Sequence, residues 1–116
     1  MAIIILKDDL TSKDVEKARE DYEFYIKITV DIEKQVVALG GEYHAVAENV
    51  LIEKYDCKSK NICGGGYTIN TRKFETNAVI NLRPPINTSM EIIDPDGRKK
   101  YIELVQEKLK CIDQLI

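Results

Sequence analysis

Asp31-Ile-Glu-Lys-Gln-Val-Val-Ala-Leu-Gly-Gly-Glu-Tyr-His-Ala-Val-Ala-Glu48 is the stretch that decides the fold of this chain. It contains the end of one predicted strand, a turn at Glu33 and Lys34, and a returning strand over Gln35–Leu39. The last four residues of the returning strand are apolar, which is typical of a central strand because both of its faces are buried. Two glycines then end the strand, and the pattern predicts a helix over Glu42–Tyr55.

The segments on either side extend this hairpin into a sheet. Strict alternation over Tyr25–Ile32 predicts the first strand of the hairpin. A β-branched run over Ile3–Leu6 predicts another strand, and Thr11 with Asp14 predicts the capped start of a first helix. Asp94 followed by a proline predicts the start of the last helix.

The rest of the chain completes a single domain. Tyr67–Asn70 and Ala78–Arg83 are predicted as a second strand pair, and 56–66 is predicted as a loop. The buried side of the last helix is predicted to consist of Tyr101, Leu104, Val105, Lys108, Leu109 and Ile112. The order β-α-β-β-α-β-β-α predicts an α+β fold, a two-layer sandwich with a mostly antiparallel sheet over residues 1–116.

Composition narrows the classes of function. The 116 residues carry 17 Lys and Arg against 20 Asp and Glu, a net charge of −3. Nucleic-acid binding normally needs a basic surface, so we expect no nucleic-acid role. The longest early apolar run, Ala2–Leu6, is too short for a membrane span or a signal peptide. We therefore expect no membrane association and a cytoplasmic location.

The three cysteines do not indicate a metal site or a disulfide framework. Cys57, Cys63 and Cys111 are odd in number, and without an export signal we expect reduced thiols. The first two are separated by five residues, too far for a zinc knuckle, and no fourth ligand is evident. No nucleophile elbow, kinase or metalloprotease motif occurs, and the paired and triple glycines lack the lysine and serine of a phosphate loop.

Strand alternation predicts a polar sheet face. If Ile28, Val30, Ile80 and Leu82 pack under the helices, the opposite face carries hydrogen-bonding side chains. These are Lys27, Thr29, Asp31, Thr68, Asn70, Asn81 and Arg83. Such a face fits a solvated surface, a dimer interface, or a cleft in which Arg83 binds a carboxylate or phosphate.

The only histidine lies in a second polar group. His44 and Glu48 are four residues apart and share one helix face, with Glu42 in the first turn. Together they form half of a divalent-metal site, for which Asp31 or Glu33 would have to supply further ligands. The alternative is structural: Glu42 faces the helix dipole, His44 bonds a carbonyl, and Glu48 faces water.

Three blocks carry a resemblance: Asp31-Ile-Glu-Lys34, Ala38-Leu-Gly-Gly-Glu-Tyr-His-Ala45 and Ile80-Asn-Leu-Arg-Pro84. In these blocks the chain resembles a family of short prokaryotic proteins of unknown function, from near Met1 to the final helix. That family pattern has an acidic residue where this chain has Val46. The absence of that acid removes a candidate metal ligand beside His44. The resemblance implies the fold and the polar positions, and no activity.

The resulting hypothesis is a binding or protein-interaction module that forms a homodimer. Its candidate ligand-binding residues, for a protein partner or a small polar ligand, are Asp31, Glu42, His44, Glu48, Asn70, Asn81 and Arg83. One alternative is a metal-dependent hydrolase or lyase-like enzyme that uses His44, Glu48 and Asp31. Another is a structural subunit of a larger complex, which predicts an exposed apolar patch. The sequence favours a non-enzymatic role and indicates no cofactor beyond that divalent metal.

Overall fold

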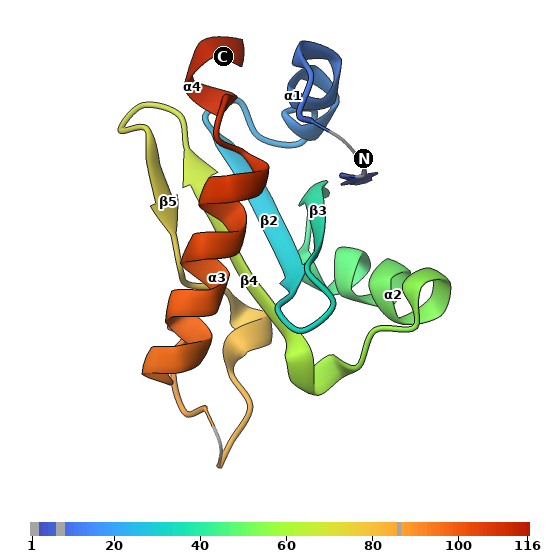
Figure 1. The fold of residues 1–116 in the computed structure, drawn as a ribbon, viewed down its shortest axis with the longest axis vertical. Helices are drawn as coiled ribbons and strands as arrows, with labels where there is room; N and C mark the ends of the chain where they lie inside the picture. The colour runs from blue at the N-terminus through green and yellow to red at the C-terminus, as the bar shows by residue number, and fades with distance from the viewer. Residues whose placement is uncertain (1–2, 7–8, 86) are drawn as a thin grey trace.

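A computed structural model describes residues 3–6, 9–85 and 87–116 of the chain. Positions 1, 2, 7, 8 and 86 of the predicted domain lie outside the described residues. The strands are β1 (Ile3–Ile5), β2 (Tyr25–Asp31), β3 (Val36–Gly40), β4 (Ile62–Thr68) and β5 (Lys73–Glu75). The helices are α1 (Ser12–Ala18), α2 (His44–Tyr55), α3 (Pro95–Lys108) and α4 (Ile112–Leu115), with 3-10 turns η1 (Ser59–Asn61) and η2 (Val79–Asn81). The predicted α+β class is confirmed (Figure 1).

The five strands form one sheet in the order β1-β3-β2-β4-β5, and every neighbouring pair is antiparallel. The predicted hairpin is confirmed as β2 and β3, in which Ile28 lies opposite Leu39. Asp31 fixes its turn, because the side-chain Oδ1 accepts hydrogen bonds from the amides of Glu33 at 2.8 Å and Lys34 at 2.9 Å. An aspartate that bonds the backbone two residues on is a common device for tight turns.

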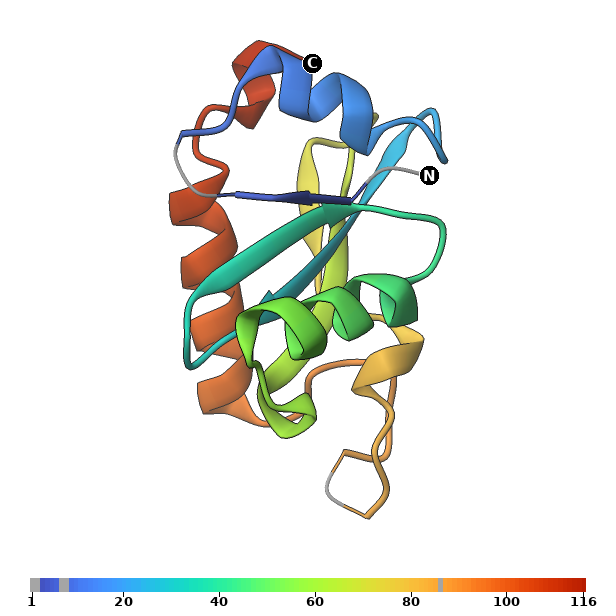
Figure 2. The same cartoon turned by 90° about the vertical axis from the view of Figure 1, so that its right-hand side faces the viewer.

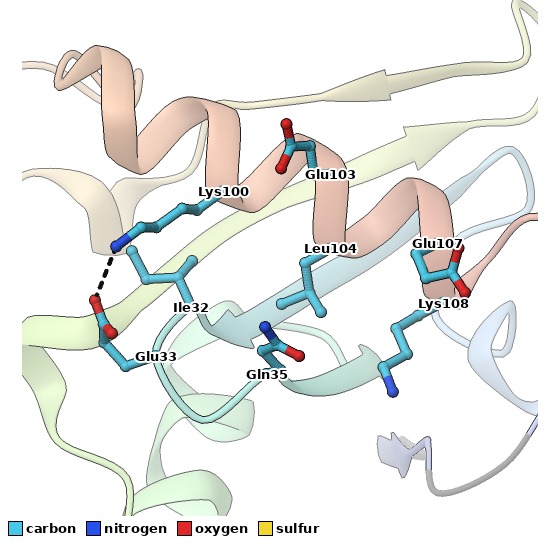
Figure 3. A pocket seen from close by; sticks show the side chains of 8 residues that line it. All are labelled: Ile32, Glu33, Gln35, Lys100, Glu103, Leu104, Glu107 and Lys108. Carbon is cyan, nitrogen blue, oxygen red and sulfur yellow. Dashed lines mark hydrogen bonds and ion pairs between the residues drawn. The ribbon is translucent and has the colours of Figure 1, made fainter.

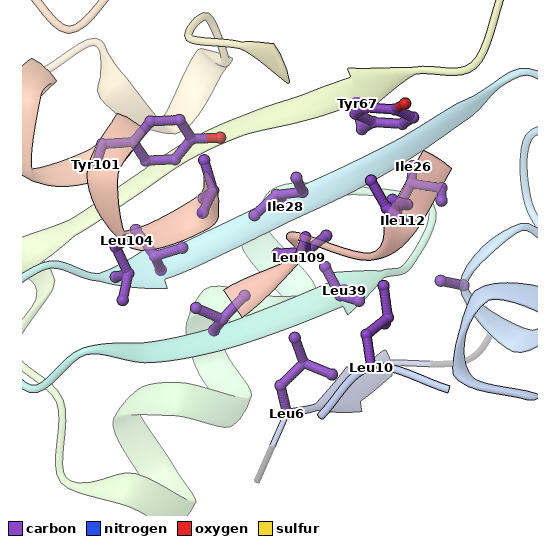
Figure 4. Packing of buried hydrophobic residues seen from close by; sticks show 14 of the residues in the cluster. Leu6, Leu10, Ile26, Ile28, Leu39, Tyr67, Tyr101, Leu104, Leu109 and Ile112 are labelled. Carbon is purple, nitrogen blue, oxygen red and sulfur yellow. The ribbon is translucent and has the colours of Figure 1, made fainter. Parts of the chain in front are cut away.

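Helices pack on both faces of the sheet (Figures 1 and 2). One face carries the larger core, in which residues of β2, β3 and β4 meet side chains of α1, α3 and α4 (Figure 4). Leu104 and Val105 of α3, and Leu109 at its C-cap, are buried there, as predicted. The other face packs against α2 through a smaller apolar cluster of Ala38, Ala47, Leu51, Cys57 and Ile62. Most helices therefore share one face, and α2 covers the other.

The triple glycine lies in a strand, so the predicted loop over 56–66 is wrong in its second half. Gly64, Gly65 and Gly66 belong to β4, which pairs with β2 along seven residues. A Cβ at Gly64 would lie 2.8 Å from Ala78 Cβ and 2.9 Å from His44 Cδ2. Glycine is needed here because neighbouring groups approach the backbone too closely for a side chain, and not because the segment must bend.

The prediction of a strand over Ala78–Arg83 is also wrong. Strand β5 lies earlier, in the connection predicted to be polar loop, and η2 makes a 3-10 turn at the predicted strand position. Residues 77–85 and 87–93 instead form an extension that we call the arm, which projects from the sheet (Figure 2). Its two sides meet at isolated bridges between Asn77 and Glu91 and between Arg83 and Asn87.

Helix α3 begins as predicted. The Asp94 side chain accepts a hydrogen bond from the Gly97 amide at 3.0 Å, and Pro95 occupies the first helical turn. The helix ends at Lys108, before the end that the sequence predicted, and α4 follows as a separate turn. Because α3 starts directly after the arm, its first turn lies beside the base of the arm (Figure 1).

Candidate functional site

Asn81 replaces a strand at the edge of β4. Its Oδ1 accepts a hydrogen bond from the Gly64 amide at 2.8 Å, and its Nδ2 donates to the Gly64 carbonyl at 2.9 Å. Strand β5 pairs with β4 only over Gly66–Thr68, so this edge of Gly64 has no backbone partner from β5. Nδ2 also lies 3.0 Å from the Met90 carbonyl on the other side of the arm. One carboxamide thus joins the sheet to both sides of the arm.

Arg83, two residues after Asn81, also bonds the edge of β4 with its side chain. Its guanidinium donates to the Ile62 carbonyl at 2.6 Å and to Glu48 Oε2 at 2.7 Å. Glu48 comes from α2 and also accepts a bond from Ser59 Oγ at 3.3 Å. The Glu48 and Arg83 side chains are only 18% and 30% exposed, so their ion pair is screened less than one on the open surface. We call Asn81, Arg83 and Glu48 the clasp, because they hold the arm against β4 and α2.

Asn87 holds the two sides of the arm together, and the sequence analysis did not single it out. Its Nδ2 lies within 2.8 Å of the carbonyls of Asn81, Ser89 and Glu91, and its Oδ1 accepts from the Ile93 amide at 3.1 Å. An asparagine in a loop with two prolines is a turn signal, but nothing in its local sequence predicts four partners. The arm is therefore fixed by two asparagine side chains as well as by backbone bridges.

His44 has a structural bond. It is 9% exposed, and its Nε2 lies 2.7 Å from the Gly65 carbonyl, which fixes the proton on Nε2 because a carbonyl only accepts. Burial lowers the pKa of His44, opposed by the bond to Gly65 and assisted by the charge of Lys27. The neutral ring is therefore favoured. Its position matches the structural alternative that the sequence left open, in which the ring bonds a carbonyl.

Asp31 lies on the same sheet face, fully buried at the end of β2. One carboxylate oxygen serves the hairpin turn, and the other has no hydrogen-bond partner among the described residues. Burial, together with this carboxylate, raises the pKa of the Cys57 thiol to about 11. Cys57 is therefore a protonated core residue at neutral pH and not a nucleophile.

The structure brings together only part of the predicted polar set. Glu48, Asn81 and Arg83 form the clasp, whereas Glu42 and Asn70 are exposed on separate segments, before α2 and in the turn after β4. Among the described residues, no group of three or more His, Cys, Asp or Glu side chains is placed to hold a metal ion. The remaining two members, His44 and Asp31, are buried and bond backbone groups of the sheet and the hairpin.

The arm carries exposed apolar side chains. Eight large hydrophobic residues are exposed within the described part of the chain, and half of them lie on the arm. These four are Val79 at 71%, Met90 at 50%, Ile93 at 49% and Leu82 at 45% exposure. Val79 and Leu82 are three residues apart around η2, where side chains at that spacing align. Strand alternation predicts Leu82 to pack under the helices, and its exposure shows that this prediction is wrong.

Several hollows lie beside α3, and two of them are also lined by residues of other segments. A cavity of about 200 Å³ at the base of the arm is lined by residues that include Cys63, Asn81 and Arg83. A groove of about 360 Å³ lies between α3 and the β2–β3 hairpin (Figure 3). Charges of both signs line this groove, and Lys100 pairs with Glu33 across it at 3.3 Å. Of the two, only the cavity at the arm includes predicted site residues.

Comparison with known proteins agrees with the resemblance seen in the sequence. No curated protein and no solved structure matches the chain. No helix in the described part of the chain is long and apolar enough to cross a membrane. A family model described as a protein of unknown function, DUF5674, matches residues 4–108. Since this match covers nearly all of the sequence, the chain belongs to the DUF5674 family.

Proposed function

We propose that this chain is a protein-interaction module whose contact surface is the arm. The observation that carries the proposal is the concentration of exposed apolar side chains on one segment. Single exposed hydrophobic residues are ordinary on protein surfaces, but a grouped set is typical of a binding surface. In this proposal the predicted polar residues of the clasp do not touch the partner. They hold the surface that does.

The rigidity of the arm supports this role. Binding through a loop normally costs free energy, because the loop must be ordered in the complex. Here Asn81 and Asn87 each bond several backbone groups across the arm, and Glu48 with Arg83 anchors it to α2. The order is already present in the free chain. An apolar surface held this way binds with a smaller entropic cost.

The partner that we propose is a second copy of this chain. The arm contains only two charged residues, Arg83 and Glu91. Both are paired within the chain, to Glu48 at 2.7 Å and to Arg98 at 3.3 Å respectively. In a twofold dimer each patch meets its own copy, so an unpaired charge would face itself and repel. The arm avoids this repulsion, and its apolar side chains are complementary to themselves.

The expected dimer is weak. Burying a half-exposed aliphatic side chain contributes about 1 kcal/mol, so eight such side chains from two arms contribute about 8 kcal/mol. Loss of translational and rotational freedom opposes association by several kcal/mol or more. With an opposing cost of about 4 kcal/mol, about 4 kcal/mol remains, and we therefore expect a concentration-dependent dimer with a Kd on the order of 1 mM.

Sedimentation equilibrium over a range of concentrations tests the proposal. The wild-type chain is expected to pass from monomer to dimer as the concentration rises. Val79→Asp places a charge on the arm at a position 71% exposed, so it should leave the fold intact and abolish the dimer. Ile52→Asp is the matched control, since Ile52 is 38% exposed on α2 and is not part of the arm.

Two results would contradict the proposal. A wild-type chain that stays monomeric at concentrations of about 1 mM would remove the second copy as the partner. A dimer that survives Val79→Asp and Leu82→Asp but is lost in Ile52→Asp would place the interface on α2. Circular dichroism of each variant shows whether the fold is retained, so a lost dimer is distinguished from a lost structure.

A further inference from the structure

The cavity at the base of the arm has a mixed chemical character. Ile32, Cys63 and Ile92 contribute apolar surface from the turn after β2, from β4 and from the end of the arm, whereas Lys60 and Arg83 contribute positive charge. We propose that this cavity binds a small carboxylate with a short apolar chain. The proposal is independent of dimer formation, since it concerns the base of the arm and not its exposed apolar side chains.

Arg83 and Lys60 have N–H donors that make no hydrogen bond to the described residues. A guanidinium has five N–H donors, and the described contacts of Arg83 are those to Ile62 and Glu48. Lys60 has no hydrogen-bond or ion-pair partner among the described residues. An ammonium and a guanidinium that line one cavity with free N–H groups are suited to the two oxygens of a carboxylate.

The polar amides of the cavity are not available in the same way. Asn81 uses its Oδ1 and Nδ2 to bond β4 and the arm, and Asn87 uses both ends of its amide within the arm. Recognition therefore falls to the cations and to the apolar wall. A ligand with only polar groups would leave the wall formed by Ile32 and Ile92 against water, whereas an alkyl chain would cover it.

Charge balance favours a ligand with one negative charge. Asp94 also lines the cavity, with its carboxylate held by the Gly97 amide, and Glu48 lies beyond Arg83. Among the charged side chains that line the cavity, Lys60 and Arg83 outnumber Asp94 by one. A doubly charged phosphate would add excess negative charge beside Asp94 and Glu48.

The volume sets the length of the chain. Since water takes about 30 Å³ in the liquid, a cavity of about 200 Å³ has room for about seven non-hydrogen atoms. Pentanoate has that number of atoms. At about 0.6 kcal/mol per atom, which is ordinary for a small ligand, binding is worth about 4 kcal/mol and the Kd is on the order of 1 mM.

The experiment titrates the full chain with pentanoate, and follows backbone amide shifts by NMR. The comparison ligands are 1-pentanol, which keeps the chain and lacks the charge, and inorganic phosphate, which keeps the charge and lacks the chain. Saturable shift changes around Cys63 and Ile92 are expected with pentanoate. The Kd values for 1-pentanol and for phosphate are expected to be about tenfold higher. Equal binding of phosphate or of pentanol would overturn the proposal.

Lys60→Gln with the matched control Lys58→Gln tests the positive charge. Both lysines are exposed beside η1, but only Lys60 lines the cavity. Lys60→Gln is expected to raise the Kd for pentanoate about fivefold, and Lys58→Gln less than about twofold. Equal effects of the two substitutions would mean attraction to a charged surface and not binding in the cavity, and would overturn the proposal.

Thiol labelling gives a second readout that needs no substitution. Cys63 lines the cavity, Cys111 is exposed at the end of α3, and Cys57 is buried. Pentanoate at saturation is expected to slow alkylation of Cys63 about threefold or more, with Cys111 as the internal control. Cys63 labelling that does not change at a pentanoate concentration well above the Kd measured by NMR would place the ligand elsewhere.

Discussion

Asn81→Ala is the substitution that most directly tests the clasp. It removes the carboxamide that bonds the amide and carbonyl of Gly64 at 2.8 and 2.9 Å. Gly64 is buried, so water does not easily replace the lost partner. Each buried backbone group left without a partner costs about 1–3 kcal/mol, so the two groups together lower the free energy of unfolding by about 3 kcal/mol.

Urea unfolding, followed by circular dichroism, measures this loss. Asn81→Asp is expected to lose at least as much, because it retains the acceptor but places a carboxylate against the carbonyls of Gly64, Thr76 and Met90. Asn70→Ala is the matched control, since Asn70 is exposed in a turn and should change the free energy by less than about 0.5 kcal/mol.

The result that refutes the reasoning is a small one. If Asn81→Ala changed the free energy of unfolding by no more than Asn70→Ala, the carboxamide would not replace a strand. Hydrogen exchange supplies an independent check at a single atom. The Gly64 amide should be protected in the wild-type chain and should exchange much faster in Asn81→Ala, because its only acceptor is the Asn81 side chain.

Three further predictions concern the sheet and α2. Gly65→Ala should destabilise the fold by more than about 3 kcal/mol, because its Cβ would meet the backbone carbonyl of Glu75 as well as a buried tyrosine. Gly66→Ala should lower the free energy of unfolding by less, since the obstacle there is the end of the half-buried Tyr25 side chain. Urea unfolding compares the two variants. A larger loss in Gly66→Ala than in Gly65→Ala would contradict this packing. The free energy of unfolding should fall as the pH drops below about 6.5, because the pKa of His44 is lowered in the folded state and the unfolded chain therefore binds the proton more readily. His44→Gln should remove this dependence between about pH 7.5 and 5.5, since this is the only histidine, and an unchanged pH profile would disprove the assignment. Tyr43→Asp should raise the melting temperature. Tyr43 is the N-cap of α2, is 61% exposed and makes no side-chain cap bond, so an aspartate there should stabilise the fold by about 0.5–1 kcal/mol. A lowered melting temperature would show that packing of the tyrosine ring contributes more than a cap.

The sequence predicted those elements whose pattern is local. The β2–β3 hairpin follows from strict alternation before Glu33 and Lys34 and a short apolar run after them, and Asp94 with Pro95 marks the start of α3 unambiguously. Such signals need no knowledge of the rest of the chain. The family resemblance rests on short blocks of the same kind, and the family model confirms it.

The failures depend on contacts between distant segments. Three successive glycines resemble a loop. The need for them in β4 comes from groups that are distant in sequence, which are His44 and Ala78 at Gly64, Tyr101 at Gly65 and Tyr25 at Gly66. Alternation over residues 78–83 resembles a strand, but the Asn81 side chain takes the place that a backbone strand would occupy. A single side chain that bonds a strand edge in this way gives no periodic sequence pattern from which it could be predicted.

The candidate site shows the same division. Asn81, Arg83 and Glu48 were predicted as candidate ligand-binding residues in two separate groups, and the structure brings them together in the clasp. Their role differs from the sequence hypothesis, because they bond the chain itself and support an apolar surface. Glu42 and Asn70 joined the predicted set on spacing alone, and they lie on other segments because the strand that was expected to align Asn81 and Asn70 is absent.

Isotope-filtered NMR on a mixed sample tests the central claim most directly. One half of the chains carries labelled methyl groups and the other half does not, so that only contacts between copies are recorded. If the chain forms a dimer through the arm, we expect intermolecular contacts among the methyl groups of Val79, Leu82, Met90 and Ile93 at concentrations where the dimer is populated. Intermolecular contacts that involve other surfaces and spare these four side chains, or none at any concentration, would contradict it.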